Sequence, residues 1–411
     1  MGPALTALAC AAALEGAHLV TALELTTRVD GRREQAELRW VIRRDENERG
    51  VAPHQSGWMD YGHTPWLNHH LAVVTRRAGQ PSVRWMSSAL ELDGLFVEGD
   101  DVIVRSKGTL TRYVFRGWQL ERSERPPDPS LSARRLAARF DTGLVHLAVV
   151  GDVMVGRATA RALDVVGPER AFAEVRPVLA RADLRLGNLE SCFREGGEAR
   201  GALDLVAPPR HLAALDALGF DALSLANNHC ADADAAFSQA LLGDAGIAGV
   251  RGAPWLSRTT GASVAVVALL AWPSTREALD AALSSTFEAQ LRDARARADV
   301  VVALVHFGEE YERTPSAAQR RVAAWLFERG VVAVFGAHPH VQQPVEQPTG
   351  STLVAWSLGN FLFDQEGYGS ADGGTEEAVV LEVRAHRVLG LTWRATPFRI
   401  VGRGRLERVV R

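Results

Sequence analysis

The sequence predicts a layered α/β domain of the metallophosphatase-like type, preceded by a smaller, mainly β domain. Between about residues 18 and 122, short runs alternate apolar and polar residues and are separated by Gly, Asp, Asn and Pro, a pattern typical of antiparallel strands. From about residue 144 to residue 375, near-continuous apolar runs of strand length alternate with helical patterns. Such runs are typical of strands that helices cover on both sheet faces.

A proline-rich stretch separates the two parts. Residues 123–132 read SERPPDPSLS and show no hydrophobic periodicity, which is typical of a linker. We therefore predict a mainly β domain plus linker over residues 1–132 and a second domain over residues 133–411. At 411 residues the chain is long enough for two domains of this size.

Composition and charge exclude some classes of function. The net charge is −3 and the basic residues are dispersed, so we expect no nucleic-acid partner. No apolar run approaches the roughly 20 residues needed to span a bilayer, so the sequence does not show membrane association. Residues 4–14 are apolar and read either as part of an export signal or as a first helix. Localisation therefore stays open between the cell envelope and the cytoplasm.

Polar side chains follow five predicted strands of the second domain at the point where each strand ends. They are Asp152, Glu190, Asn228 with His229, His306, and the pair His338 and His340. Taken singly, each reads as a turn, a helix cap or a core histidine. In open α/β sheets, however, ligands bind outside the carboxyl ends of the strands, so together these side chains favour one shared site.

The pair His338 and His340 flanks Pro339. Residues i and i+2 lie on the same side of an extended chain, and proline blocks a helix and holds an extended or turn geometry. Both imidazoles are therefore expected to face one point. Imidazole, carboxylate and amide ligands together suit Mn, Fe or Zn better than Ca. The predicted cofactor is one or two divalent metal ions, since two ions that share a bridging carboxylate need about this many ligands.

Six short motifs of the second domain occur in a characteristic order. They are GDVMVGR (151–157), GNLES (187–191), DALSLANNHCAD (221–232), VHFGEEY (305–311), GAHPHVQQPVE (336–346) and SLGNFLFDQ (357–365). This series resembles that of the CapA proteins, the bacterial poly-γ-glutamate capsule synthesis family, which are similar in turn to calcineurin-like metallophosphoesterases. The resemblance covers roughly residues 144–400 and leaves the N-terminal domain without an assigned role.

The resemblance implies roles for individual residues. Asp152 and His340 would bind a first metal ion, and the second ion would take Asn228, His306 and His338. The proton donor would be His229. Glu310 is a second catalytic candidate in the family motif, with helix capping as its alternative.

The sequence departs from the phosphoesterase pattern at two positions. Met154 stands where a phosphoesterase would place a histidine, and Asn188 occupies the position of the bridging aspartate. Because an amide cannot bridge as a charged group, we assign the bridging role to Glu190. Three residues that follow strand ends, Glu346, Asn360 and Asp364, are expected to accept hydrogen bonds from ligating imidazoles.

The resemblance implies a metal-dependent hydrolase or transferase linked to synthesis of poly-γ-glutamate or another capsule or envelope polymer. Its substrate would be that polymer or a phosphorylated or γ-glutamyl precursor, and capsule-synthesis proteins would be its partners. One alternative is a non-catalytic capsule-synthesis support protein with a relic metal site, which the methionine at position 154 motivates. The other is a general metallophosphodiesterase.

Overall fold

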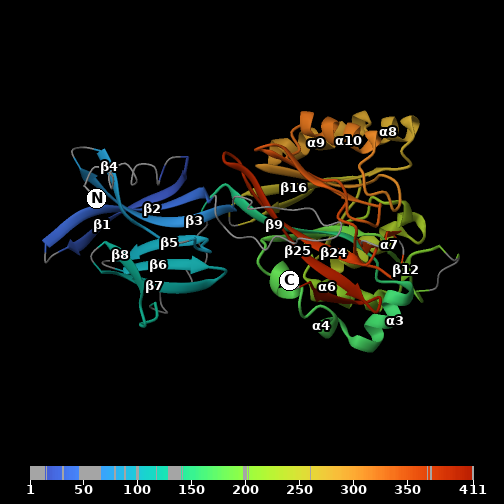
Figure 1. Ribbon diagram of the computed structural model, residues 1–411, viewed down its shortest axis with the longest axis horizontal. Helices are drawn as coiled ribbons and strands as arrows, with labels where there is room; N and C mark the ends of the chain where they lie inside the picture. Colours follow the sequence, from blue (N-terminus) through green and yellow to red (C-terminus); the bar gives the residue numbers. More distant parts are fainter. Residues whose placement is uncertain are drawn as a thin grey trace. The chain divides into compact units, whose positions relative to one another are not determined.

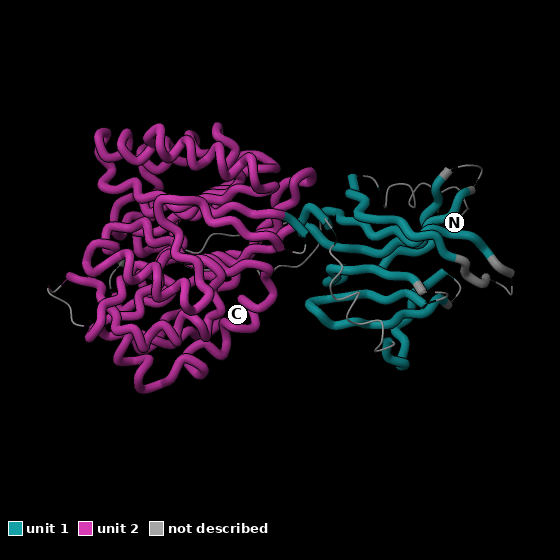
Figure 2. The backbone as a smooth tube through the Cα atoms, turned by 180° about the vertical axis from the view of Figure 1, so that it is seen from behind, with its two compact units in different colours: residues 1–48, 65–144, 260–262 teal, residues 49–64, 145–259, 263–411 magenta. Residues whose placement is uncertain are grey.

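The computed structural model divides the chain into two compact units (Figure 2). Unit 1 comprises residues 1–48, 65–144 and 260–262, and unit 2 comprises residues 49–64, 145–259 and 263–411. The predicted boundary at residue 132 and most of the apolar N-terminal stretch lie outside the described residues, so both stay predictions. The structure describes residues 14, 16–29, 32–45, 66–77, 80–87, 89–98, 101–116, 118–127, 140, 142–197, 201, 203–259, 261–367, 369–370 and 373–409.

Unit 1 contains two four-stranded antiparallel sheets whose strands follow one another in sequence order. The two sheets share one hydrophobic core. Leu38 and Trp40 enter it from the first sheet, and Val102 and Val104 from the second. The strands are β1 (His18–Val29), β2 (Arg32–Asp45), β3 (Trp66–Arg77), β4 (Gln80–Met86), β5 (Gly94–Glu98), β6 (Asp101–Ser106), β7 (Thr109–Arg116) and β8 (Gln119–Arg122).

Unit 2 is an α/β unit, which confirms the predicted class, and it is built on two large sheets (Figure 1). In the first sheet the order is β14-β13-β10-β9-β24-β25-β26, with β21 also paired to β9. This sheet comprises β9 (Leu144–Val153), β10 (Leu184–Leu189), β13 (Ala222–Ser224), β14 (Ala248–Val250), β21 (Asn360–Leu362), β24 (Glu377–His386), β25 (Gly390–Val401) and β26 (Arg405–Arg408).

The second sheet of unit 2 has the order β15-β16-β17-β18-β20-β19, and its four central strands are parallel. Its strand β17 lies beside β10, and β20 lies beside β25, so the two sheets face one another. All eight residues of β17 are buried, as a parallel strand covered on both faces requires. The strands are β15 (Trp255–Arg258), β16 (Ser263–Ala271), β17 (Val300–Phe307), β18 (Ala333–Ala337), β19 (Val345–Thr349) and β20 (Thr352–Ala355).

Two short ribbons complete the strands of unit 2. They pair β11 (Cys192–Phe193) with β12 (Val206–Ala207), and β22 (Gly369–Ser370) with β23 (Gly373–Gly374).

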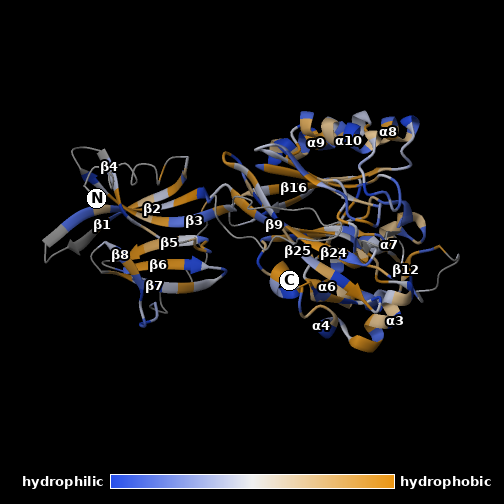
Figure 3. Ribbon diagram, viewed as in Figure 1, coloured by the Kyte–Doolittle hydropathy of each residue, from blue (hydrophilic) through white to orange (hydrophobic). Residues whose placement is uncertain are grey.

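Helices bury one apolar face each against these sheets (Figure 1). The helices α3 to α7 contribute to the core of the first sheet, and α8 to α10 to that of the second. Hydrophobic and hydrophilic residues alternate along α8, α9 and α10, as expected for helices with one exposed face (Figure 3). None of the helices in the described ranges has the length and hydropathy needed to cross a bilayer. The helices are α3 (Arg157–Val166), α4 (Pro168–Ala171), α5 (Arg176–Leu179), α6 (Leu212–Leu218), α7 (Ala235–Asp244), α8 (Arg276–Ala282), α9 (Ser285–Arg297), α10 (Ala317–Glu328), and the 3₁₀ helices η2 (Pro209–His211) and η3 (Asn228–Ala231).

Two glycines allow the close backbone approaches that position the strand ends. A Cβ atom on Gly151 would lie 1.9 Å from the carbonyl oxygen of Gly359, and one on Gly336 would lie 2.0 Å from that of Trp356. The N–H of Asp152 donates to the same Gly359 oxygen at 2.9 Å. Glycine is therefore required at both positions, because any side chain would push the neighbouring backbone away.

A buried carboxylate in β24 anchors the first sheet. Glu382 is fully buried, and it accepts hydrogen bonds from Arg394 at 3.0 Å and from Arg181 at 2.9 Å. His146 lies 3.3 Å away. Burial alone would raise the pKa of Glu382, but the hydrogen bonds from His146 and Arg394 outweigh burial and lower the pKa to about 2.

We expect the Glu382 carboxylate to make the free energy of unfolding depend on pH. The folded-state pKa of Glu382 is lowered from 4.5 to about 2, so its contribution of roughly 3 kcal/mol is present above pH 4.5 and is lost as the pH falls toward 2. Urea unfolding of the wild type and of Glu382→Gln from neutral to acidic pH measures this contribution. The difference between their free energies of unfolding should shrink on acidification, and a difference independent of pH would contradict the lowered pKa of Glu382.

Candidate metal centre

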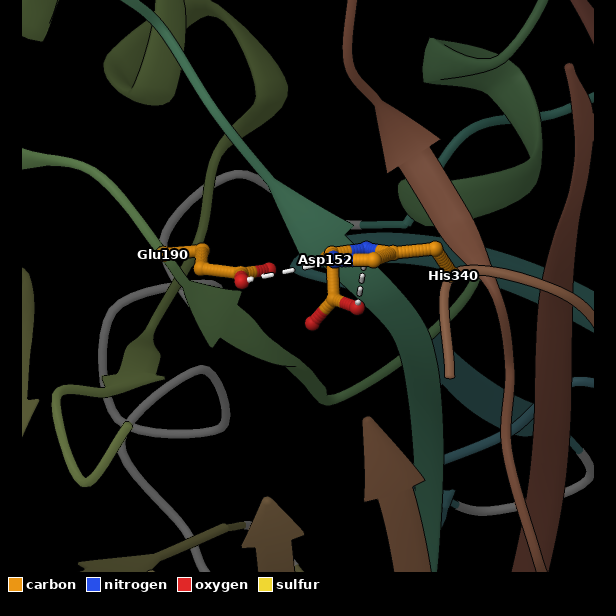
Figure 4. A group of neighbouring side chains, drawn as sticks. All are labelled: Asp152, Glu190 and His340. Atoms are coloured by element: carbon orange, nitrogen blue, oxygen red, sulfur yellow. Dashed lines mark ion pairs between the residues drawn. The ribbon is translucent and has the colours of Figure 1, made fainter. Parts of the chain in front are cut away.

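Three buried side chains from distant parts of the chain meet between the two sheets of unit 2. Asp152 lies near the end of β9, Glu190 directly follows β10, and His340 lies in the loop after β18. One ligand atom of each lies within 4.8 Å of those of the other two. Figure 4 shows the three side chains turned toward one another, with dashed lines for the ion pairs among them. Together they could hold a metal ion.

Glu190 is the member of this group whose charge most needs compensation. Its side chain is fully buried, and neither carboxylate oxygen has a hydrogen-bond partner among the described residues. Burial and then the negative charge of Asp152 raise the pKa of Glu190 well above its ordinary value. A buried, unsatisfied carboxylate beside a second one costs free energy in the absence of a cation, so this donor set fits a divalent metal ion.

The other two members carry opposite charges. Burial opposes ionisation of Asp152, but its hydrogen bond and charge interaction with His340 prevail and lower the pKa to about 2. Burial would likewise lower the pKa of His340, but the charges of Glu190 and Asp152 raise it to about 9. His340 Nδ1 lies 3.4 Å from Asp152 Oδ2, and its Nε2 lies 3.7 Å from Glu190 Oε1. The protonated imidazole thus offsets the charge of the neighbouring carboxylates, and because only neutral imidazole binds metals, binding of an ion here would release a proton from His340.

A second set of predicted ligands lies next to the first. His306 at the end of β17 places Nε2 2.6 Å from Asn228 Oδ1, and its ring lies 4.7 Å from that of His338. Both ring nitrogens of His338 are buried without a hydrogen-bond partner in the described part of the chain. Burial lowers the pKa of His306 well below its usual range, and burial followed by the charge of His340 lowers the pKa of His338 to about 4. Both imidazoles are neutral near pH 7, the form that binds metals.

The His-Pro-His segment adopts the turn alternative and not the extended one. His338 and His340 have φ angles of 99° and 59°, in the left-handed region that non-glycine residues rarely occupy. The His338 N–H donates to Asp152 Oδ2 at 3.1 Å, and the Tyr311 N–H donates to the Pro339 carbonyl at 2.8 Å. These bonds hold the turn, which places the two imidazole centroids 6.1 Å apart.

Amide side chains connect the strand ends. Asn227 donates to Asn188 Oδ1 at 3.2 Å, and Asn188 in turn donates to Asp152 Oδ1 at 2.8 Å. Asn188 therefore orients Asp152, whereas Glu190 supplies the second carboxylate of the group. His340 Nδ1 lies 3.0 Å from Asn360 Oδ1, which confirms that Asn360 orients a histidine.

The candidate proton donor His229 lies at the border of the buried group. It lies in η3, its Nδ1 donates to Asp232 Oδ2 at 2.7 Å, and its Nε2 lies 3.9 Å from Glu190 Oε1. Its side chain is 21% exposed. Asp232 thus fixes the ring with Nε2 toward the buried Glu190 carboxylate.

Two acidic residues of the family motifs pair with arginines and not with the histidines that we expected. Glu346 is exposed and pairs with Arg320 at 3.3 Å, and Asp364 pairs with Arg157 at 2.6 Å, so the prediction that these two carboxylates orient histidines is wrong. Glu310 is exposed in the turn after β17 and caps no helix, because Ser316 caps α10. Its catalytic role stays a prediction.

Sequence reasoning missed one aromatic neighbour of the site. The ring of Trp272, in the loop after β16, lies 5.3 Å from that of His338 and is 36% exposed. No motif or spacing marked this residue, since it reaches the site only through the packing of its loop. Met154, at the position of the histidine in phosphoesterases, is fully buried in the hydrophobic core.

The fold and site define an α/β protein with a buried carboxylate and imidazole cluster between two sheets. The family model described as bacterial capsule synthesis protein PGA_cap matches residues 146–243 and 251–365, more than half of the chain. This chain therefore belongs to that family, which confirms the resemblance to the CapA proteins. Every residue of the candidate metal centre lies within the matched ranges.

Two curated relatives carry the family name. The chain is 26% identical over 248 residues to the PGA biosynthesis protein CapA of Bacillus subtilis (strain 168), covering 55% of this chain and 65% of that protein. It is 29% identical over 247 residues to the capsule biosynthesis protein CapA of Bacillus anthracis, covering 53% and 60%. The similarity therefore spans less than two thirds of the length of either relative.

Proposed function

We propose that this protein is a metal-dependent hydrolase or transferase that acts in the synthesis of a bacterial capsule or envelope polymer. The names of the two relatives support the biological role. One observation supports the chemistry above the others: the fully buried Glu190 carboxylate lacks hydrogen bonds among the described residues and lies beside Asp152. Proteins rarely keep such a group without a cation or a catalytic use.

The proposal assigns the metal ligands to two neighbouring sets. Asp152, Glu190 and His340 would hold a first ion, and the second set is Asn228, His306 and His338. Nitrogen and oxygen donors of this kind suit Mn, Fe or Zn. When bound, the ion would act as a Lewis acid on a phosphoryl or acyl oxygen of the substrate. We further propose that the two facing sheets of unit 2 have the layering of the calcineurin-like metallophosphoesterases.

His229 would transfer the proton to the leaving group. Asp232 holds Nδ1–H, which leaves Nε2 as the atom that carries the mobile proton. The ring is partly exposed, and its Nε2 lies 3.9 Å from Glu190 Oε1, at the edge of the proposed metal centre. This chain thus needs His229 for proton transfer and not for metal binding.

Replacing His229 with glutamine is therefore expected to lower kcat by about 100-fold or more while the bound metal stays unchanged. Turnover of a chromogenic phosphodiester and of oligo-γ-glutamate by Mn-loaded protein, together with elemental analysis of the same sample, separates the two properties. Asp232→Asn is the matched variant, which keeps His229 but weakens its orientation, and it should lose less activity. Loss of metal from the His229 variant would contradict the proton-donor role.

The substrate of this reaction would be the polymer itself or a phosphorylated or γ-glutamyl precursor, and other capsule-synthesis proteins would be partners. A non-catalytic support role is the second candidate, and the core position of Met154 favours it, because this side chain cannot contribute the ligand that phosphoesterases place there. Elemental analysis decides between the two. Less than one equivalent of transition metal after purification would favour the support role.

A further inference from the structure

Two free cysteines lie together beside the candidate metal centre. Cys192 lies in β11, shortly after the predicted ligand Glu190, and β11 lies beside η3. Cys230 lies in η3, directly after the predicted proton donor His229. Cys192 Sγ lies 3.0 Å from the carbonyl oxygen of Cys230 and 3.2 Å from that of His229. The side chains of the two cysteines also make a hydrogen bond with each other, so two thiols from distant parts of the chain are in contact.

One of these two cysteines borders a surface pocket. Cys230 lines a pocket of about 670 Å³, together with Arg194 and Arg251. Cys192 lies outside the pocket lining and is 1% exposed, whereas Cys230 is 6% exposed. The pocket has room for many molecules of the size of water or hydrogen peroxide. A small oxidant can therefore reach Cys230 before it reaches Cys192.

Packing alone does not account for this arrangement. A single buried cysteine usually behaves as a small apolar residue, and both cysteines do contribute to the core of the first sheet. Packing does not require that the two sulfur-bearing side chains touch, nor that one of them borders a pocket. An accessible thiol beside a second, less accessible one is the arrangement in which oxidation of the first is resolved as a disulfide.

We propose that Cys192 and Cys230 form a reversible disulfide when the protein meets a peroxide. The Cys230 sulfur attacks the peroxide, the O–O bond breaks, and the thiol becomes a sulfenic acid with release of one water molecule. The Cys192 sulfur then attacks the sulfenic sulfur, so that the S–S bond forms, the S–O bond breaks and a second water molecule leaves. The two sulfurs are oxidised and the peroxide is reduced. A dithiol reductant reverses the reaction by thiol–disulfide exchange.

The disulfide would join two segments of the candidate metal centre. It would connect β11, which follows Glu190, to η3, which contains Asn228 and His229. The two cysteines are 38 positions apart in the chain, so the bond would also restrict the unfolded chain and stabilise the fold. The inference goes beyond the proposed function and does not depend on it, since thiol oxidation requires neither a bound metal ion nor turnover.

Peptide mapping by mass spectrometry tests the proposal on the full chain. The folded protein is treated with equimolar hydrogen peroxide with all metal chelated, then unfolded, and the remaining thiols are alkylated. We expect peptides linked through Cys192 and Cys230, and we expect the link to disappear after treatment with dithiothreitol. Cys10→Ser, which removes the third cysteine of the sequence, should form the same link. Cys192→Ser should instead accumulate a sulfenic acid at Cys230, which dimedone labels.

Two thiols that stay reduced, a link from either cysteine to Cys10, or sulfinic acid at Cys230 beside a free Cys192 would overturn the proposal. Urea unfolding of the oxidised and reduced wild type provides a second measurement. The disulfide form should unfold at a higher urea concentration, and peroxide should not raise the midpoint of Cys192→Ser. A disulfide form that unfolds at a lower concentration than the reduced protein would show that the bond does not fit the native fold.

Discussion

Asparagine in place of Asp152 is expected to weaken Mn binding by on the order of 100-fold or more and to abolish metal-dependent turnover. The change removes one of the two carboxylates of the candidate metal centre and keeps the size of the side chain. Isothermal titration with Mn measures the affinity. Asp293→Asn on α9, whose side chain is 50% exposed, is the matched control and should bind Mn as the wild type does.

Glu190→Gln sharpens the same test, because its two expected effects have opposite signs. Without metal the variant should be at least as stable as the wild type, since glutamine removes a buried carboxylate without hydrogen bonds in the described structure. With Mn present, the wild type should gain stability and the variant should not. A variant that is destabilised without metal and still gains stability with Mn would contradict the ligand role of Glu190.

Alanine in place of Gly151 is expected to destabilise the protein by about 3 kcal/mol or more. Its Cβ would lie 1.9 Å from the Gly359 carbonyl oxygen, which is backbone and cannot rotate away as a side chain could. Separation of the two segments would also break the hydrogen bond from the Asp152 N–H to that oxygen. The metal affinity should therefore fall together with the stability.

Gly350→Ala is the matched control for this substitution. A Cβ at position 350 would have no atom within 4 Å, and we expect a change within about 0.5 kcal/mol. Chemical denaturation of the three proteins gives the free energies, and Mn titration of the same samples gives the affinities. A Gly151 variant as stable as the Gly350 variant would show that β9 does not approach Gly359 so closely.

Many strands of unit 2 could be predicted because each is a continuous hydrophobic run in the sequence. The run LVHLAVVGDV has ten buried residues in β9, so its continuous hydrophobicity reflects coverage of both faces. The strand order also explains why the sequence could predict that Asp152, Glu190 and His306 lie in one site. Asp152 and Glu190 lie at the ends of neighbouring parallel strands of the first sheet, and His306 lies near the end of a strand of the second sheet, which faces the first.

Other features depended on interactions that a single sequence does not encode locally. The turn at His338 and His340 is held by bonds to Asp152 and Tyr311, which are far away in the chain, so proline alone left two geometries open. Trp272 contacts His338 because of how the loop after β16 packs, and Asp364 pairs with Arg157 and not with a histidine. Such placements follow from tertiary packing, which hydrophobic periodicity does not specify.

Anomalous diffraction at the Mn edge from crystals of Mn-loaded protein would locate the bound ions. We expect a peak within bonding distance of Asp152, Glu190 and His340, and full occupancy of the second set would add a peak beside His306 and His338. Mn peaks found only at other places, with the Glu190 carboxylate still without any cation or hydrogen-bond partner, would contradict the proposed metal centre.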